Sequence, residues 1–491
     1  MYTSARITRR NLLQALAVGS VGVLAACAPA AAPSPTAAPA PAATQAAKPA
    51  ATAAPPAPAA TPAPAPAATQ APAAKPYAGQ KISVLHLTGA NWDVNFKTEL
   101  PNFEKKTGIQ ANVDFLPESA QMPKVRTVLA AKSDEYDVFF FRGNFMPELT
   151  KANSVEPLDV YIAKAKAEDK EFQHEDLIPS ILSAFNFDGK QWGIPLMGGG
   201  TVLFYNKDMF KAAGLDRSPK NLAELEEYAK KLTKLGQAGF VLRGRREAGT
   251  NVYPWIFIWK ISGAKWYDNI RGNWFNEKWE PQFGGKEAVA AVDRWVNLLR
   301  EYGPKGVASY GWNECLADFQ QGTVAMWLDD PVFAAQVEDP AQSKVVGKTG
   351  YAVVEGPPGD TKYGAVAPWG FIMNVYTKKK DPAWEFIKWG TGLETQKNMV
   401  ERGYTLPTRR SLLLGDTMKK KQSAEFVAAL EKAMSVADPS YKPLIPQQAE
   451  INDIVSVGLS KALTGQASAA DAMKEVDDKV LAIMKRDGYI K

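Results

Sequence analysis

Short apolar runs alternate with amphipathic stretches near the start of the globular part of the chain. Residues 81–87 (KISVLHL) and 137–141 (DVFFF) predict buried strands, and residues 109–115 alternate apolar and polar positions as a third strand does. Between these strands, residues 100–107 and 122–131 have helical spacing. The order strand, helix, strand, helix, strand predicts right-handed βαβ units and therefore an α/β sheet.

Polar and aromatic side chains follow the first and third of these strands. Trp92 and Asp93 come after the first strand, and Arg142 and Asn144 come after the third. Ligands of open α/β sheets bind beyond the carboxyl ends of the strands. We therefore expect these four side chains to lie near a bound ligand.

A run of three glycines, 198–200, marks the most informative stretch of the globular part. It precedes a predicted strand over 201–205. Further along, Asn221 is placed to cap a helix over 222–235, with Glu224 as the second member of a capping box. Glycines before a strand allow unusual backbone angles, which predicts a crossing or a hinge. The run lacks the GxxxxGK[ST] pattern of a phosphate-binding loop.

The N-terminal residues predict export and a lipid anchor. Three arginines precede an apolar stretch over 11–26 that is too short to span a bilayer as a stable anchor. A small residue then precedes Cys27, as in a lipobox, so we expect a lipoprotein signal peptide over 1–26 and lipidation of Cys27. The alternative is an ordinary signal peptide followed by a chance cysteine.

Residues 27–76 predict a disordered tether between that anchor and the globular part. Alanine and proline dominate the segment and large apolar side chains do not occur, so nothing offsets the entropy of ordering it. Frequent proline favours extended polyproline II, and the simplest role is that of a solvated spacer.

Because residues 8–13 also resemble a twin-arginine signal, export after folding is an alternative to general secretion.

Composition narrows the chemistry of the globular part. The 58 Lys and Arg against 52 Asp and Glu give +6, and removal of the signal peptide's three arginines leaves +3, so a nucleic-acid partner is not expected. With Cys27 lipidated, Cys315 is alone, which excludes an intrachain disulfide and a cysteine metal cluster. His86 and His174 are the only histidines, which argues against a histidine-rich metal site and a Ser-His-Asp triad. We expect neither a metal nor a cofactor.

Several segments in a fixed order resemble the motifs of one known family. This family is the family 1 extracellular solute-binding proteins, the maltose-binding-like receptors of ABC importers. The resemblance covers nearly the whole chain from about residue 80, and it depends on the order and spacing of the motifs. The segments are GIPLMGGGTVLFYNKDMFKAAGLDRSPKNLAELEEYAKKLT (193–233), an amphipathic helix (283–302), FQQGTVAMW (319–327), GYAVVEGPP leading to GAVAPWG (350–370), an A..F..W helix (383–390) and GYTLPTR (403–409).

The resemblance implies the α/β, two-lobe fold of type II periplasmic-binding proteins, with a ligand cleft between lobes that a multi-strand hinge joins. It also implies where the lobes begin and end. The expected limits are 77–200 plus 372–412 for lobe 1 and 201–371 plus 413–491 for lobe 2, with crossings near 198–200, 365–370 and 409–414.

The resemblance further implies a binding protein rather than an enzyme. Such a receptor captures a carbohydrate, a sugar or an oligosaccharide, by hinge closure and delivers it to the permease subunits of an ABC transporter. With the predicted lipid on Cys27, the protein would work outside the cytoplasm, anchored to the cell membrane. We expect it to be a monomer.

Sugar-binding sites need flat aromatic rings for the C–H faces of the sugar and planar polar groups for its hydroxyls. Trp255 and Trp259 have a structural alternative, because their i, i+4 spacing lines one helix face whether that face meets a ligand or the core. Arg142 has one as well, since it could simply pair with a nearby acid. The candidate ligand-binding residues at loops that match the family are Trp92, Asp93, Arg142, Asn144, Trp255, Trp259, Trp312, Glu314, Asp329, Asp330, Trp369, Gly370 and Arg409.

Three alternatives remain open from the sequence. A polyol or a glycerol phosphodiester is the second choice of ligand, and convergence of Arg142 and Arg409 would favour the phosphate. A secreted carbohydrate-active enzyme would need paired carboxylates, but Asp329 and Asp330 are adjacent and would point to opposite faces of a strand. An adhesive surface lipoprotein would not need a glycine-rich hinge.

Overall fold

The computed structural model describes residues 75–89, 92–234, 236–246 and 250–491, and of Trp92 it describes the backbone only. These residues all lie in one compact unit, Pro72–Lys491. The expected signal peptide over 1–26, the lipidation site at Cys27 and the expected tether as far as residue 74 lie outside the described residues.

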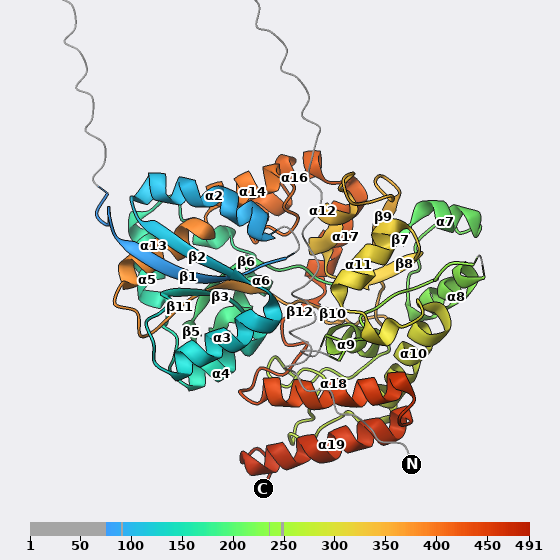
Figure 1. Cartoon of the computed structure of the whole chain (residues 1–491). Coiled ribbons are helices and arrows are strands. Elements are labelled where there is room, and N and C mark those ends of the chain that lie inside the picture. Colours follow the sequence, from blue (N-terminus) through green and yellow to red (C-terminus); the bar gives the residue numbers. More distant parts are fainter. Residues whose placement is uncertain (1–74, 90–91, 235, 247–249) are drawn as a thin grey trace, which may run out of the picture. The chain divides into compact units, whose positions relative to one another are not determined.

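A five-stranded sheet in the order β2-β1-β3-β11-β6 organises the first lobe, which comprises the elements packed on this sheet (Figure 1). β1 is parallel to β2 and to β3, which confirms the predicted βαβ units, whereas β11 runs antiparallel to β3 and β6. The strands are β1 (Lys81–Leu87), β2 (Gln110–Leu116), β3 (Val138–Arg142), β6 (Gly193–Met197) and β11 (Trp369–Met373).

The antiparallel strand β11 enters this sheet from far along the chain. All five of its residues are buried, and it lies between β3 and β6. Within the described residues, β6 is joined to the sheet through β11 alone. The expected lobe limit between residues 371 and 372 passes through β11.

A three-stranded antiparallel sheet in the order β8-β7-β9 organises the second lobe. The chain passes from the first sheet to the second through residues 198–201, between β6 and β7, and returns through residues 366–368, between β10 and β11. The remaining strands are β7 (Val202–Asn206), β8 (Met326–Asp329), β9 (Thr349–Ala352), the parallel pair β10 (Gly364–Ala365) and β12 (Ala437–Asp438), and the hairpin β4 (Asn186–Phe187) and β5 (Lys190–Gln191).

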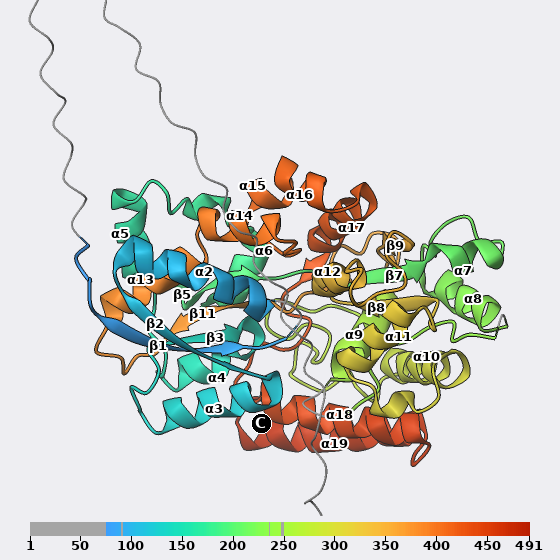
Figure 2. The same ribbon diagram turned by 45° about the horizontal axis from the view of Figure 1, so that its top comes forward.

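Helices pack on both sheets and on one another. α2, α3 and α13 contact the first sheet, α7, α11 and α17 contact the second, and α18 and α19 lie side by side (Figures 1 and 2). The helices are α2 (Trp92–Thr107), α3 (Glu118–Ala130), α4 (Met146–Lys151), α5 (Asp159–Glu168), α6 (Pro179–Leu182), α7 (Lys207–Ala212), α8 (Leu222–Thr233), α9 (Val252–Ile261), α10 (Lys286–Tyr302), α11 (Trp312–Gln321), α12 (Ala334–Val337), α13 (Lys380–Gly390), α14 (Leu393–Glu401), α15 (Arg410–Leu413), α16 (Asp416–Lys421), α17 (Ala424–Ser435), α18 (Gln448–Thr464) and α19 (Ala469–Arg486).

The predicted cap of α8 is half confirmed. Asn221 Oδ1 accepts a hydrogen bond from the backbone N of Glu224 at 3.0 Å, as an N-cap residue should. The Glu224 carboxylate does not return to Asn221. It accepts from the backbone N of Lys220 at 2.9 Å and forms an ion pair with Arg217, so the reciprocal half of the capping box is replaced by a surface pair.

The glycine run at 198–200 is needed for space, and this corrects the prediction from backbone angles. None of the three glycines has a positive φ. A Cβ on Gly199 would lie 2.7 Å from Cγ of Pro331, and one on Gly200 would lie 2.7 Å from the carbonyl oxygen of Ala433. The first crossing between the sheets is therefore packed closely against the second lobe and against α17.

None of the helices in the described part of the chain combines the length and apolar character that a membrane crossing requires.

Candidate functional site

A small cavity lies between the two lobes. Its volume is about 170 Å³, and loops and helix ends of both lobes form its walls. The lining residues are Leu87, Thr88, Pro117, Glu118, Ser119 and Arg142 from the first lobe, and Arg243, Arg245, Thr250, Tyr253, Gly311, Trp312, Asn313 and Lys442 from the second.

The first-lobe wall stands at the carboxyl ends of three parallel strands. Thr88 follows β1, Glu118 opens α3 just after β2, and Arg142 ends β3. Arg142 Nη1 lies 3.3 Å from Glu118 Oε1, and its guanidinium lies 5.1 Å from the ring centre of Trp369. This is the edge of an open α/β sheet at which ligands bind.

Two ion pairs hold the arginines of the second-lobe wall. Arg243 Nε donates to Asp329 Oδ2 at 2.8 Å, and its Nη2 donates to Asp329 Oδ1. Arg245 pairs with Glu314, whose other oxygen accepts from the backbone N of Gly311 at 2.8 Å. Two of the predicted carboxylates, Asp329 and Glu314, are therefore each paired with an arginine that lines the cavity, while neither lines it itself.

Trp312 and Tyr253 supply the aromatic surface of the cavity. Trp312 begins α11, and its ring stacks on Phe333 with centres 5.3 Å apart and planes 23° apart. The Tyr253 hydroxyl lies 3.1 Å from Thr201 Oγ1, and the Arg243 guanidinium lies 5.2 Å from its ring centre. The Trp312 indole is thereby held in place at the cavity wall, as recognition of a C–H face requires.

A hydrogen bond joins the lobes beside the cavity. Asn144, which follows β3 and is fully buried, donates from Nδ2 to the carbonyl oxygen of Pro439 at 2.8 Å. Pro439 comes directly after β12 in the second lobe. The predicted residue Asn144 thus contributes to the contact between the lobes and does not line the cavity.

Asp330 caps a short helical turn and has an unusual pKa. Its Oδ1 accepts a hydrogen bond from the backbone N of Val332 at 3.0 Å. Burial raises the pKa of Asp330 to about 7, and the charge of Asp329 adds to the rise, while the bond from Val332 and the charges of Arg243 and Arg142 oppose it. An unfolded Asp ionises near pH 4. The free energy of unfolding therefore falls as the pH rises from about 4 through about 7.

We expect Asp330→Asn to stabilise the protein above pH 7, because the amide keeps the acceptor for Val332 and removes the buried charge. A pKa raised by about three units corresponds to an upper limit of about 4 kcal/mol, so a gain of about 2–4 kcal/mol at pH 8 and little change at pH 4 are expected in urea unfolding. The matched control is Asp360→Asn, since Asp360 accepts from the backbone N of Lys362 at 2.8 Å in the same i, i+2 arrangement. Equal unfolding curves for wild type and Asp330→Asn at pH 8 would contradict the assignment.

The structure places three aromatic candidates in the core and outside the lining of the cavity. Trp255 and Trp259 lie on α9 with ring centres 5.1 Å apart, and both are buried in the core of the second lobe, as their helical spacing allowed. Trp369 begins β11 and is buried against Phe140, 5.7 Å away, and beneath Arg142. Its contribution is to support the Arg142 guanidinium.

Gly370 and Arg409 also lie outside the lining of the cavity. A Cβ on Gly370 would lie 2.4 Å from the carbonyl oxygen of Ile194, so glycine is needed there for strand packing. Arg409 is 0% exposed, and its guanidinium donates to the carbonyl oxygens of Thr391, Phe172 and Gln173 at 2.9–3.0 Å. Arg409 therefore ties three backbone segments together and does not converge with Arg142.

The first predicted pair lies at the start of α2 rather than in a loop. The side chain of Trp92 is outside the described residues. Asp93 Oδ2 accepts from Thr88 Oγ1 at 2.7 Å and pairs with Lys97 at 3.3 Å. Asp93 therefore orients Thr88, which lines the cavity.

Sequence reasoning missed Glu118, Arg243, Arg245, Tyr253 and Lys442. Glu118 could have been predicted from the sequence. Ligands bind beyond the carboxyl ends of the strands, and this applies to the second strand as well as to the first and third. The basic stretch 243–246 (RGRR) was a second signal, since it follows an apolar run. No feature of the sequence pointed to Lys442, because tertiary packing alone brings it to the cavity.

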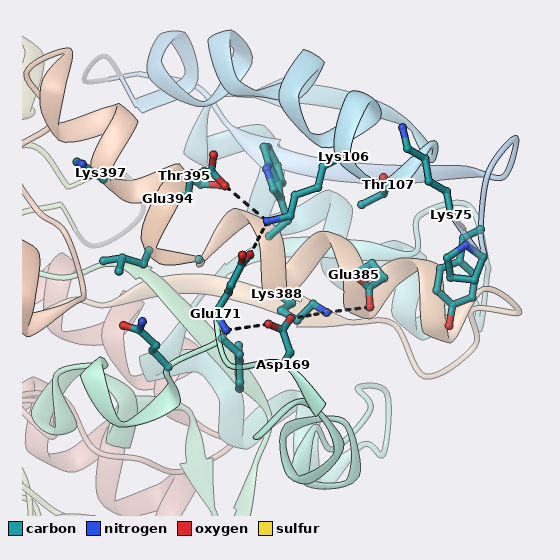
Figure 3. A pocket seen from close by; sticks show the side chains of 17 residues that line it. Lys75, Lys106, Thr107, Asp169, Glu171, Glu385, Lys388, Glu394, Thr395 and Lys397 are labelled. Carbon is teal, nitrogen blue, oxygen red and sulfur yellow. Dashed lines mark hydrogen bonds and ion pairs between the residues drawn. The ribbon is translucent and has the colours of Figure 1, made fainter. Parts of the chain in front are cut away.

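A larger hollow of about 910 Å³ lies on the first lobe, and Figure 3 shows its lining. Several of its charges are paired with one another: Lys106 lies 3.0 Å from Glu171 and 3.5 Å from Glu394, and Lys388 lies 3.0 Å from Asp169. Its lining includes no residue of the second lobe. A ligand there would not bridge the lobes, so we place the candidate site in the smaller cavity.

Among the described residues, no group of three His, Cys, Asp or Glu side chains is arranged to hold a metal ion. Cys315 is free and buried.

Comparison with known proteins decides the family. The model of the bacterial extracellular solute-binding proteins matches residues 85–397, which is well over half of the chain. The chain belongs to this family. The resemblance of the sequence motifs is thereby confirmed, and the two-lobe α/β architecture is that of type II periplasmic-binding proteins.

This solute-binding protein has relatives that are named for sugar alcohols. A mannitol-binding protein of Pseudomonas aeruginosa is 30% identical over 336 residues, which cover 65% of this chain and 74% of that one. An erythritol/L-threitol-binding protein of Mycolicibacterium smegmatis is 27% identical over 394 residues, covering 76% and 79%. A solute-binding protein of Agrobacterium vitis S4 solved with bound D-mannitol is 28% identical, with a TM-score of 0.73 and coverage of 84% and 100%.

Proposed function

We propose that this solute-binding protein captures one small polyhydroxylated solute, a sugar alcohol or a monosaccharide-sized sugar, in the cavity between its lobes. Closure of the lobes around the solute presents the loaded form to the permease of an ABC importer. The observation that carries the proposal is the 170 Å³ cavity, whose wall combines hydroxyl, carboxylate and guanidinium groups with an indole face.

The size of the cavity favours a small solute over an oligosaccharide. Sites for drug-sized ligands have volumes of roughly 300–1,000 Å³, and this cavity is smaller, at about 170 Å³. The sugar alcohols in the names of the relatives are of this smaller size class. We therefore propose a solute no larger than a monosaccharide rather than an oligosaccharide, and a polyol becomes a leading choice.

A phosphodiester ligand and a glycosidase activity both lose their structural support. The phosphodiester depended on convergence of Arg142 with Arg409, and Arg409 donates to backbone carbonyls instead. A glycosidase would need two carboxylates that face the bond. Among the lining residues that the structure describes, Glu118 is the one carboxylate, and Asp329 is paired with Arg243. We propose a non-catalytic receptor.

Delivery and attachment complete the proposal. The family to which the chain belongs is extracellular, so we propose that the receptor works outside the cytoplasm, as a monomer attached through lipid on Cys27. The predicted tether over 27–76 would let the receptor reach a permease in the same membrane.

A thermal-shift panel tests the proposal directly. The panel contains tetritols, pentitols, hexitols, monosaccharides, their aldonic acids and phosphates, disaccharides and maltooligosaccharides. A solute at 100 times its Kd stabilises the folded state by about 2.7 kcal/mol, which is an easily measured rise in Tm. A rise with a monosaccharide-sized member supports the proposal, whereas a response to oligosaccharides alone would contradict it.

Trp312→Ala should weaken binding of the best solute in that panel by about 30-fold, since a truncated aromatic contact costs about 2 kcal/mol and 1.4 kcal/mol is tenfold. Isothermal titration calorimetry measures the change. Trp279→Ala is the matched control, because Trp279 is also partly exposed but packs on Tyr489, 4.8 Å away, and does not line the cavity. Equal affinities for wild type and Trp312→Ala would remove the indole from the site.

A further inference from the structure

The charges around the cavity are unequal. Four of the lining residues carry a positive charge, and one, Glu118, carries a negative charge. Three of the cations have carboxylate partners, because Arg142 pairs with Glu118, Arg243 with Asp329 and Arg245 with Glu314. Lys442 is the cation whose partner must be found elsewhere.

Lys442 is buried and forms no ion pair with any residue that the structure describes. Lys442 comes shortly after β12 in the second lobe and is 2% exposed. Its ammonium donates a hydrogen bond to the amide oxygen of Asn452 at 2.7 Å. The same ammonium lies 5.7 Å from the ring centre of Tyr441. Among the ion pairs of the described residues, Lys442 takes part in none. A buried ammonium that has only neutral partners is costly unless it meets an anion or loses its proton.

Two further polar atoms near Lys442 lack partners. Arg142 Nε and the Tyr441 hydroxyl are buried, and neither has a hydrogen-bond partner in the described part of the protein. Arg142 lines the cavity together with Lys442 and is close enough for their charges to repel. A solute that places acceptor oxygens at this end of the cavity would satisfy donors that are otherwise unpaired.

We infer that the solute of this receptor carries an acidic group, and that Lys442 and Arg142 bind that group. This inference rests on the proposed function and adds one property to the solute: it is a sugar acid or a sugar phosphate rather than a neutral polyol. Carboxylate and phosphate share the required chemistry, because both offer several anionic oxygens to an ammonium and a guanidinium.

The protonation of Lys442 supplies an independent readout. Burial, together with the charges of Arg142 and Arg243, lowers the pKa of Lys442 well below its usual range, and only Glu118 opposes them. An anion beside the ammonium raises that pKa again. Binding of the acidic solute should therefore take up a proton, which calorimetry detects as a binding enthalpy that depends on the ionisation enthalpy of the buffer.

The other titratable groups around Lys442 set the pH of that measurement. Asp330 has a pKa of about 7, and burial raises the pKa of Tyr441 and of Tyr253. At pH 9 Asp330 is ionised and both phenols keep their protons. Proton uptake at pH 9 that Lys442→Met abolishes therefore reports on Lys442 itself.

The experiment compares three probes of matched size: D-mannitol, D-mannonate and D-mannitol 1-phosphate, each titrated into the full-length protein at pH 7. We expect at least one of the two acids to bind at least 30-fold more tightly than D-mannitol. The acid that binds more tightly shows whether the site prefers a carboxylate or a phosphate. Lys442→Met should remove at least 30-fold of the affinity for that acid and abolish the preference for the acid over D-mannitol. Lys419→Met, at an exposed lysine of α16, is the control and should change neither.

The outcomes separate the two proposals. If D-mannitol binds as tightly as both acids, the acidic group is refuted while the polyol receptor stands. If an acid is preferred and folded Lys442→Met keeps that preference, Lys442 is not the recognition group. If Lys442→Met does not fold, the wild-type protein alone is the test: preference for an acid together with proton uptake on binding at pH 9 supports the proposal, and the lack of either contradicts it. If neither these probes nor any monosaccharide-sized member of the wider panel binds, both proposals fall.

Discussion

Lys260→Met should reduce the free energy of unfolding by about 3–5 kcal/mol, because removal of one partner leaves a buried charge unpaired. Lys260 Nζ lies 2.7 Å from Asp438 Oδ2 and 3.0 Å from Asn273 Oδ1, and Lys260 and Asp438 are both almost inaccessible to water. The pair ties α9 to β12, which directly precedes the segment that carries Tyr441 and Lys442. Urea unfolding at pH 7 measures the loss.

The controls separate a buried pair from pairing in general. Lys265→Met removes the partner of Glu277 in an exposed pair and should change the stability little. The double variant Lys260→Met/Asp438→Asn removes the buried charge as well and should recover at least about half of the lost stability, as a double-mutant cycle would show. A loss below about 1 kcal/mol for Lys260→Met alone would be evidence against strong coupling of this pair.

Arg243→Met should strongly weaken solute binding and destabilise the second lobe. Arg243 lines the cavity and donates through two nitrogens to the fully buried Asp329, so the variant loses a donor to the solute and leaves a carboxylate unpaired. We expect the affinity to fall by at least about 100-fold, the equivalent of about 2.7 kcal/mol. Titration calorimetry with the best solute of the panel measures the binding, and urea unfolding measures the stability.

A second variant separates the two roles of Arg243. Arg243→Met/Asp329→Leu removes both charges of the pair and should restore stability without restoring binding. Arg217→Met is the matched surface control, because Arg217 forms the same two-pronged pair with Glu224 on the exposed face of α8. Retained affinity in folded Arg243→Met would show that the solute does not contact this guanidinium.

The local sequence predicted the elements of the first lobe well. The strands 81–87, 109–115 and 137–141 were found within a residue of their observed limits, because their apolar patterns reflect burial in a parallel sheet. The local sequence does not predict where β11 lies in the sheet. Its pairing with β3 joins residues that are more than two hundred positions apart in the chain. Order and spacing of the family motifs, rather than periodicity, indicated that the chain returns to this sheet.

The candidate site was predictable where it follows the carboxyl end of a strand or a loop that matches the family. Arg142 lies at the cavity because it ends β3, and Trp312 because it opens α11 beside Gly311. Trp255, Trp259 and Trp369 have the chemistry of a sugar site, but that chemistry also suits a core, where the structure places them. Lys442 could not be predicted from the sequence, because only the folded structure shows that it forms no ion pair with the described residues.

The position of β11 also affects how the protein is made. A growing chain presents the apolar strands β3 and β6 with open edges until residues 369–373 have been synthesised, about three quarters of the way along the molecule. Unpaired apolar edges of this kind favour aggregation of nascent chains, and they are surfaces that chaperones bind. The first lobe is therefore completed late in synthesis, although its first strand emerges early.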